Sequence, residues 1–199
     1  MTNYVNLKYE IGRLKNIVIY FSIDEIPKHY QLSGIHTLEY YNYHYERFRI
    51  KSISLVDYLL LFVNHCLQMG IPVNKCNIYS ITDNTNLKNS DLVKSLKDFD
   101  SAIAKLRGDR NKIIHQGNFE PRSMTTLNDV ILEQEENIII EADIENGKLK
   151  SEEISKAIEH FEIEILMIKN HVEKVFNNLI PHINEQVEVL ELRDNKAIN

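Results

Sequence analysis

The chain has 199 residues, with a hydrophobic fraction of 43% and a charged fraction of 26%, which is ordinary for a soluble globular protein with its own core. The formal net charge of −6 argues against a protein that coats nucleic acid through bulk positive charge. Only six glycines and four prolines are present, and this favours long regular elements over a loop-rich β fold. We find no repeat or linker, so we expect one all-α domain over residues 1–199, built as a helical bundle.

Membrane-spanning and secreted classes are not expected. No run approaches the roughly 18 apolar residues of a transmembrane helix, and residues 1–10 lack the apolar stretch of a signal peptide. Cys66 and Cys76 are the only cysteines and form no CxxC motif, so neither a disulfide framework nor a zinc site is indicated. We expect a cytoplasmic protein with no membrane partner, no metal and no cofactor.

The N-terminal third contains one clear helix. Residues 16–23 are apolar and β-branched and fit either helix or strand. From about Leu38 to Met69, apolar side chains recur at helical spacing over a broad face, which is typical of a central helix. Gly70 and Pro72 are expected to end this helix. The apolar face consists of Phe48, Leu55, Val56, Leu59, Leu60, Phe62, Val63, Cys66 and Leu67.

A second helix is predicted from about Ser90 to His115. Asn89 or Ser90, followed by Asp91, suits its N-terminus, and Gly117 suits its end. The apolar stripe steps by three or four residues through Leu92, Leu96, Phe99, Ile103 and Leu106.

A third helix is predicted from about Ser151 to Leu179. Its apolar residues alternate in steps of four and three, which makes a seam about four heptads long. We expect this seam to be mainly core, with a contribution to dimer contact, and Pro181 to end or kink the helix. The seam consists of Ile154, Ile158, Phe161, Ile165, Ile168, Val172, Val175 and Leu179.

The segment before the third helix allows two structures. Residues 137–144, followed by Glu145-Asn146-Gly147, fit a short β-hairpin, since Asn-Gly favours a tight turn. They equally fit the end of a helix that starts near Thr125, followed by a loop. A short hairpin or an irregular insert is therefore expected around residues 137–150. From Glu133 to Glu164, eleven acids stand against three bases, and a solvated acidic helix face explains them.

Polar residues gather at the end of the second predicted helix. Successive residues of a helix are about 100° apart around its axis, which places Arg110 at a position of the apolar stripe where an apolar residue is expected. Arg107, Asn111 and His115 are spaced i, i+4 and i+8 and form a polar stripe beside it. Between Lys105 and Lys112 there are four bases and one acid. A buried arginine is costly unless it is paired or faces a polar cleft, so this helix end predicts a cleft or an interface.

These side chains suit RNA cleavage without a metal. Histidine can take or give a proton near neutral pH, so His115 can deprotonate a ribose 2′-hydroxyl or protonate the departing 5′-oxygen. The planar guanidinium of Arg110 matches phosphate oxygens and can stabilise charge in the transition state. Asn111 can hold the histidine ring or the phosphate. The alternative interpretation of Arg110 and His115 is a cation pair that stabilises the helix dipole.

The segment Arg110-Asn111-Lys112-Ile113-Ile114-His115 resembles the signature of HEPN-superfamily ribonucleases, in which Arg and a polar residue precede a His. Gln116 and Gly117 continue the resemblance. It implies a helical bundle with the motif near the end of a long helix and another long helix after it. It also implies catalytic roles for Arg110, Asn111 and His115, an RNA substrate and a homodimer in which two motifs share one cleft. Arg107 and Lys112 are then expected to bind substrate.

One position departs from the resemblance. HEPN toxins that are controlled by a nucleotidyltransferase antitoxin tend to carry Tyr two residues after the His, and here that residue is Gly117. The departure argues against that type of control and leaves the nuclease interpretation in place. The resemblance favours a toxin–antitoxin, abortive-infection or other defence setting, with an antitoxin or another regulatory partner. The alternatives are a catalytically silent HEPN module that binds RNA or nucleotide or scaffolds a complex, and a purely structural helical dimer.

Helix geometry links the motif to dimerisation. On an ideal helix Arg110 and His115 lie about 140° apart, so one helix does not aim both at one phosphate. Either the arginine bends round, or the helix distorts near Gly117, or a second subunit completes the site.

Other aromatic and histidine residues are expected to be structural. An aromatic cluster on the first long helix can stack on RNA bases, but mixed spacing favours core and rim positions. The cluster consists of Tyr40, Tyr41, Tyr43, Tyr45 and Phe48. Scattered histidines without metal-ligand spacing are expected to be structural or exposed, and these are His44, His65, His160, His171 and His182.

Overall fold

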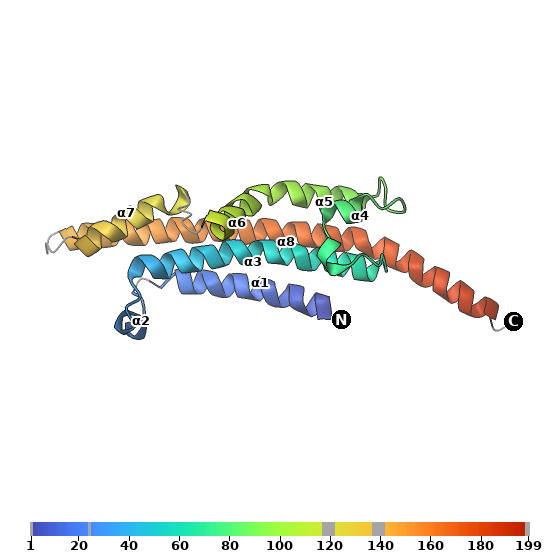
Figure 1. Ribbon diagram of the computed structural model, residues 1–199, viewed down its shortest axis with the longest axis horizontal. Helices are drawn as coiled ribbons and strands as arrows, with labels where there is room; N and C mark the ends of the chain where they lie inside the picture. Colours follow the sequence, from blue (N-terminus) through green and yellow to red (C-terminus); the bar gives the residue numbers. More distant parts are fainter. Residues whose placement is uncertain (1, 24, 117–121, 137–141, 198–199) are drawn as a thin grey trace. The chain divides into compact units, whose positions relative to one another are not determined.

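The computed structural model describes residues 2–23, 25–116, 122–136 and 142–197. Every regular element in these ranges is a helix (Figure 1), which confirms the all-α fold class. In chain order the elements are α1 (Thr2–Phe21), α2 (Lys28–Leu32), α3 (Thr37–Cys66), the 3-10 turn η1 (Val73–Lys75), α4 (Ile78–Thr82), α5 (Asp91–Ala102), α6 (Ala104–Gln116), α7 (Arg122–Glu136) and α8 (Ala142–Ala197).

Contacts between Cα atoms divide the chain into two compact units. Unit 1 comprises Met1–Tyr9, Ser54–Ala104 and Met167–Asn199, and unit 2 comprises Glu10–Ile53 and Lys105–Leu166. The helices α1, α3 and α8 each contribute residues to both units. The expectation of one domain over residues 1–199 stays a prediction.

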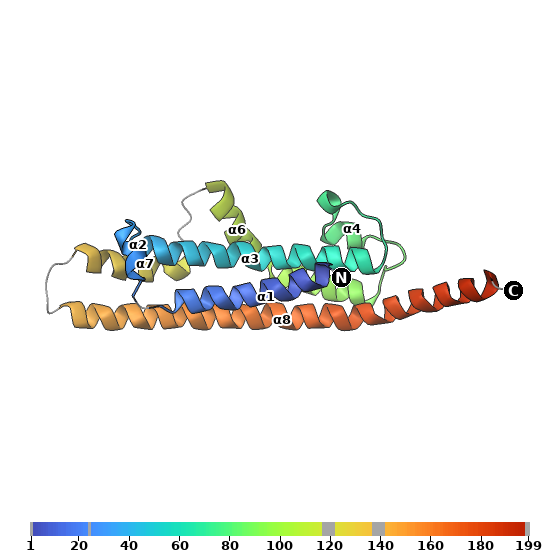
Figure 2. The same cartoon turned by 90° about the horizontal axis from the view of Figure 1, so that it is seen from below.

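Aromatic side chains from three helices build the core of unit 2. The Phe161 ring of α8 stacks on Phe48 of α3 at 4.3 Å between centroids and meets Phe21 of α1 edge-on at 5.1 Å. Tyr41 of α3 meets Phe21 at 5.1 Å, and its hydroxyl donates to the Ile23 carbonyl at 2.6 Å. Both ribbon views show these parts of α1, α3 and α8 side by side (Figures 1 and 2). Large edge-on and offset rings fill such a core efficiently.

The amphipathic pattern of α5 explains the core of unit 1. Leu92, Leu96 and Phe99 are buried, as the four–three spacing predicts. The Ser90 hydroxyl accepts the Val93 N–H at 3.2 Å and caps the helix, as the sequence indicates. On the outside, α5 is joined to α8 by Lys174, whose Nζ lies 2.7 Å from Asp98 Oδ2. The heptad seam of α8 continues this core with Ile168, Val172, Val175 and Leu179, all buried.

The end of α3 is set by left-handed backbone and by one carboxamide. Gln68 has φ 49° and Gly70 has φ 69°, a conformation that glycine adopts at little cost. The Asn64 side chain donates to the Ile71 carbonyl at 2.8 Å and accepts the Ile71 N–H at 3.1 Å. The helix therefore ends where Gly70 predicts, and the Asn64 side chain fixes the backbone that follows it.

The structure corrects two predicted helix boundaries and decides one open choice. The expected helix from Ser90 to His115 is two helices, α5 and α6, because Ile103 leaves the helical conformation although its N–H still bonds to the Phe99 carbonyl at 3.1 Å. Residues 16–23, left open between helix and strand, belong to α1 through Phe21. Pro181 does not end the third helix, since α8 runs to Ala197. Figures 1 and 2 show α8 bending in its C-terminal third, as an interior proline promotes.

The hairpin expected around residues 137–150 is also corrected. Residues 142–150 are helical and extend α8 nine residues upstream of Ser151, so no turn forms at Glu145-Asn146-Gly147. Residues 137–141 lie outside the described part. Extending an existing helix costs less than nucleating a new element, whereas an isolated two-stranded hairpin is marginal. The alternative, a helix near Thr125, is confirmed by α7.

Candidate active site

All five predicted site residues lie on the single helix α6. Arg107 and Arg110 are half-buried, whereas Asn111, Lys112 and His115 are exposed. The polar stripe of Arg107, Asn111 and His115 therefore emerges into solvent toward the end of the helix. A histidine in this position is accessible to a large substrate such as RNA.

Arg110 has a neighbour that orients it and no acid that neutralises it. Its Nη1 donates to Asn111 Oδ1 at 3.0 Å. In the ranges that the structure describes, no carboxylate forms an ion pair with Arg110. It follows the buried Leu106 by one helical turn, which accounts for its partial burial. A half-buried guanidinium with its charge uncompensated suits an anionic ligand.

A group of charged and polar side chains, centred on the buried Arg49 and Glu164, lies directly behind the motif. We name it the anchor cluster: Tyr45, Arg49, Asp109, His160 and Glu164. Arg49 of α3 is 1% exposed, and its Nη1 lies 2.5 Å from Glu164 Oε2 of α8. Its Nε donates to the Tyr45 hydroxyl at 2.9 Å and lies 3.7 Å from Asp109 Oδ2 of α6. His160 Nε2 lies 3.1 Å from the second oxygen of Glu164. All five residues belong to unit 2.

Arg49 keeps its charge despite burial. Desolvation opposes the positive charge of Arg49, but the hydroxyl of Tyr45 and the carboxylate of Glu164 outweigh it and raise the pKa of the guanidinium above its usual range. Buried ions are tolerated when they are paired and hydrogen-bonded in this way. Because Asp109 immediately precedes Arg110, its ion pair with Arg49 fixes the turn of α6 that carries the motif.

The anchor cluster was missed in the sequence although it leaves a signal there. Tyr45, Arg49, Ser52, Val56 and Leu59 follow one another in steps of four and three along α3. Arg49 and Ser52 thus occupy core positions of that seam, and both are buried. A charged residue in a core position implies a buried partner of opposite sign. The sequence gives no indication that Glu164 and Asp109 are those partners.

The aromatic cluster separates as expected into core and rim. Tyr40, Tyr41, Tyr45 and Phe48 are buried, whereas Tyr43 is 59% exposed. The four buried rings are too enclosed for a nucleobase to stack on them. Tyr43 is the most exposed member of the cluster.

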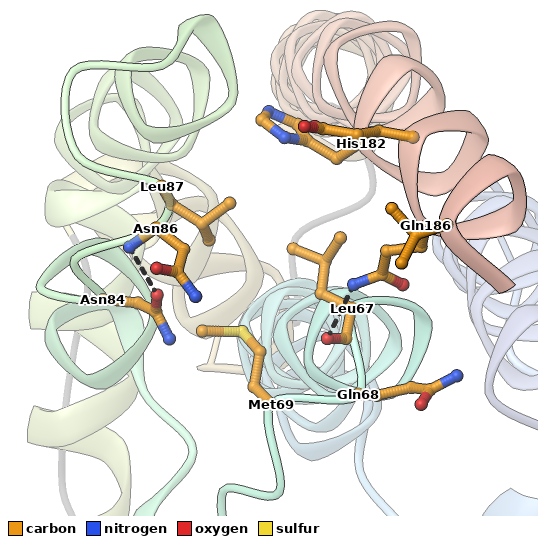
Figure 3. Close-up of a pocket in the computed structure, with 10 residues that line it drawn as sticks. Leu67, Gln68, Met69, Asn84, Asn86, Leu87, His182 and Gln186 are labelled. Carbon is orange, nitrogen blue, oxygen red and sulfur yellow. Dashed lines mark hydrogen bonds between the residues drawn. The ribbon is translucent and has the colours of Figure 1, made fainter. Parts of the chain in front are cut away.

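A hollow of about 720 Å³ lies in unit 1 and contains none of the predicted site residues. Figure 3 shows the carboxamides of Asn84 and Asn86 on one side of it and His182 and Gln186 on the other. Gln186 Nε2 donates to the Leu67 carbonyl at 3.1 Å, and the Asn86 N–H bonds to Asn84 Oδ1 at 3.0 Å. These bonds satisfy backbone groups at the end of α3 and in the turn before α5. The polar side chains around the hollow therefore have structural roles.

Two further observations concern metal binding and membrane insertion. Among the described residues, no three histidine, cysteine or carboxylate side chains gather closely enough to hold a metal ion. Within the same part of the chain, no helix combines the length and apolar character that crossing a bilayer requires.

Comparison with known proteins identifies one family. Residues 4–179 match the family model described as Cthe2314-like HEPN. The match covers α3 and α6 and most of α8, so it includes both the motif and the anchor cluster. No curated protein and no solved structure matches the chain.

Proposed function

The chain belongs to the HEPN family, and we propose that it is a metal-independent endoribonuclease. The observation that carries this proposal is the placement of Arg110, Asn111 and His115 on one helix end. There Arg110 is bonded to Asn111 at 3.0 Å and is half-buried, with no acidic partner among the described residues, while His115 is exposed. The HEPN superfamily, which often contains ribonucleases, supports the same activity.

The proposed reaction is attack of the ribose 2′-oxygen on the adjacent phosphorus. A bond forms between the 2′-oxygen and phosphorus, the bond to the 5′-oxygen breaks, and the 5′-oxygen leaves with a proton. His115 takes the proton from the 2′-hydroxyl or supplies the proton to the 5′-oxygen. Arg110 contacts the non-bridging oxygens, where negative charge increases in the transition state. Asn111 holds Arg110 toward the substrate, and Arg107 and Lys112 contact neighbouring phosphates.

We propose that two copies of the chain share one cleft. Within α6, Arg110 and His115 are about 140° apart around the helix axis, and α6 is helical through Gln116, so no distortion before that residue brings them together. Residue 117 lies outside the described part. One helix cannot direct both residues at the same phosphate, so one copy supplies the arginine and the second copy supplies the histidine. Two histidines in one cleft also allow one to act as base and the other as acid.

We also propose a biological setting for this activity. An unrestrained cytoplasmic ribonuclease harms its own cell, so a toxin–antitoxin, abortive-infection or other defence role, with a regulatory partner, is consistent with it. Gly117 stands where HEPN toxins controlled by a nucleotidyltransferase tend to carry the modified tyrosine, which argues against that form of restraint.

Cleavage of total RNA by the purified protein tests the proposal. We expect cleavage in the presence of EDTA, with products that end in a 2′,3′-cyclic phosphate or 3′-phosphate and in a 5′-hydroxyl. His115→Ala and Arg110→Ala are expected to lower the rate by at least about 100-fold. The matched controls His65→Ala and Arg47→Ala change exposed residues of the same types on α3 and are expected to leave the rate unchanged.

The other outcomes separate the alternatives. RNA or nucleotide binding without cleavage would support a catalytically silent HEPN module. Equal loss of activity in the control variants would contradict the assignment of these residues. Neither binding nor cleavage would leave a scaffolding role.

A further inference from the structure

A second hollow, of about 620 Å³, lies in unit 2 between α2 and the first turns of α3. Aromatic rings dominate its lining. Tyr40 meets the His44 ring at 4.4 Å, Tyr43 meets it at 5.3 Å, and Tyr30 lies 5.9 Å from Tyr40. We name this site the aromatic hollow. Its volume falls in the range of small-molecule sites.

The charges of the aromatic hollow are all negative. Glu39 and Glu46 line it, and no described lysine or arginine does. Glu39 uses one oxygen to accept the His36 N–H at 3.2 Å, which leaves the second oxygen available, since a carboxylate accepts several hydrogen bonds. Glu46 forms no ion pair within the described residues. Burial raises the pKa of the Glu46 carboxyl, because desolvation disfavours its charged form.

His44 does not provide that cation. Burial lowers the pKa of its imidazole, so the ring is neutral at neutral pH and contributes an aromatic face. Its Nδ1 is buried and has no hydrogen-bond partner. The hollow therefore combines neutral rings with two carboxylates, a combination that attracts organic cations and repels the phosphates of RNA.

Helix geometry sets the separation of the two carboxylates. Glu39 and Glu46 are seven residues apart on α3, so they lie on the same face, with Cα atoms about 10 Å apart along the axis. Tyr43 lies between them in sequence. A ligand with two separated positive charges can reach both.

We propose that the aromatic hollow binds a linear aliphatic diamine or polyamine. One ammonium group contacts Glu39 and the other contacts Glu46, while the methylene chain packs on Tyr43 and Tyr40. This site is separate from the motif on α6 and does not depend on RNA cleavage. It gives the chain a second ligand, of opposite charge to RNA.

Calorimetric titration of the full chain with 1,4-diaminobutane tests the proposal. The monoamine 1-butylamine is the matched ligand, because it keeps the chain length and loses one charge. We expect the diamine to bind at least tenfold more tightly than the monoamine. Glu46→Gln is expected to remove that preference, and Tyr43→Ala to weaken binding of both amines.

A control separates the site from general attraction to an acidic protein. Glu173→Gln makes the same change in net charge at an exposed position on α8, and we expect it to leave diamine binding unchanged. Equal affinity for the two amines, or equal effects of Glu46→Gln and Glu173→Gln, would overturn the proposal. Displacement of the diamine by adenosine would overturn it in favour of a nucleobase site. Thermal melting confirms that each variant is folded.

Discussion

Arg49 and Arg110 are chemically identical side chains with opposite surroundings. Arg49 is enclosed by Tyr45, Asp109 and Glu164 and has no access to solvent. Arg110 is half-buried and is bonded to a neutral carboxamide. The first arrangement satisfies the charge within the protein, and the second leaves it available. We therefore expect Arg49 to have a structural role, and the proposed function gives Arg110 the contact with the ligand.

Replacement of Arg49 by methionine tests the structural role. The variant keeps an unbranched apolar stem similar to that of arginine but removes the guanidinium, so the Glu164 and Asp109 carboxylates lose their cation. Breaking a buried pair in this way costs about 3 kcal/mol, so we expect a fall of that size in the free energy of unfolding, measured with urea. Arg47→Met, at an exposed neighbouring position, is the control and should differ little from the unmodified chain. Equal stability of the two variants would contradict a structural role for the anchor cluster.

His171 is expected to make stability depend on pH. Its ring stacks on Phe99 at 5.3 Å, and burial, assisted by Lys174 and opposed by Asp98, lowers its pKa from the ordinary 6.5. As pH falls through that ordinary value, the unfolded chain takes up a proton before the folded chain does. The free energy of unfolding therefore falls as the pH falls from about 7.5 to about 5.5.

The variant His171→Gln tests this origin of the pH dependence. It should reduce the difference between urea unfolding free energies at about pH 7.5 and about pH 5.5. Part of the difference will remain, because burial also lowers the pKa of His44. An unchanged pH dependence in the variant would show that His171 does not contribute.

Among the helices, α5 offers the most direct test of how a capping residue stabilises a helix. The Ser90 hydroxyl accepts the Val93 N–H at 3.2 Å and satisfies a donor that the helix itself leaves unpaired. Ser90→Ala should lower the free energy of unfolding by about 1 kcal/mol, measured by urea denaturation. Ser101→Ala removes a hydroxyl from an exposed position near the other end of α5 and should not be destabilising. A similar loss in both variants would mean that the cap is not the cause.

Helix interiors could be predicted from the sequence better than helix ends. The apolar stripes of α3, α5 and α8 became the core, because four–three spacing directly determines which face is buried. The break at Ile103 follows no proline or glycine. After the break, Leu106 is buried and Asp109 reaches Arg49, so contacts distant in sequence position α6. Pro181 gave the opposite error, since a long helix with packed residues before it tolerates an interior proline.

The position of the motif residues on one helix could be predicted from the sequence. The anchor cluster behind them could not. Arg110, Asn111 and His115 form a short local pattern on one helix, and all lie on α6 as expected. The anchor cluster joins residues up to 115 positions apart. No periodicity pairs Arg49 with Glu164 and Asp109, because pairing of buried charges depends on how helices pack. The aromatic hollow likewise depends on α2, a short helix that carries no strong pattern.

At the scale of the whole molecule, the proposed shared cleft makes a quantitative prediction. Arg110→Ala and His115→Ala chains can be co-expressed with different affinity tags, and the mixed dimer isolated through both tags. If the shared cleft pairs Arg110 of one copy with His115 of the other, it holds two such pairs in the unmodified dimer, and one of them is intact in the mixed dimer. The mixed dimer should then show about half the RNA cleavage of the unmodified dimer, although each variant alone is inactive.

The same experiment distinguishes a site contained in one copy. In that case one copy of the mixed dimer always lacks the arginine and the other always lacks the histidine, so no cleavage returns. An inactive mixed dimer beside an active unmodified dimer would therefore refute the shared cleft while leaving the ribonuclease activity in place. Failure to recover any protein through both tags, beside full activity of the unmodified chain at concentrations where it sediments as a monomer, would refute the role of dimerisation itself. Because the two motif residues point about 140° apart on one helix, we expect cleavage to return.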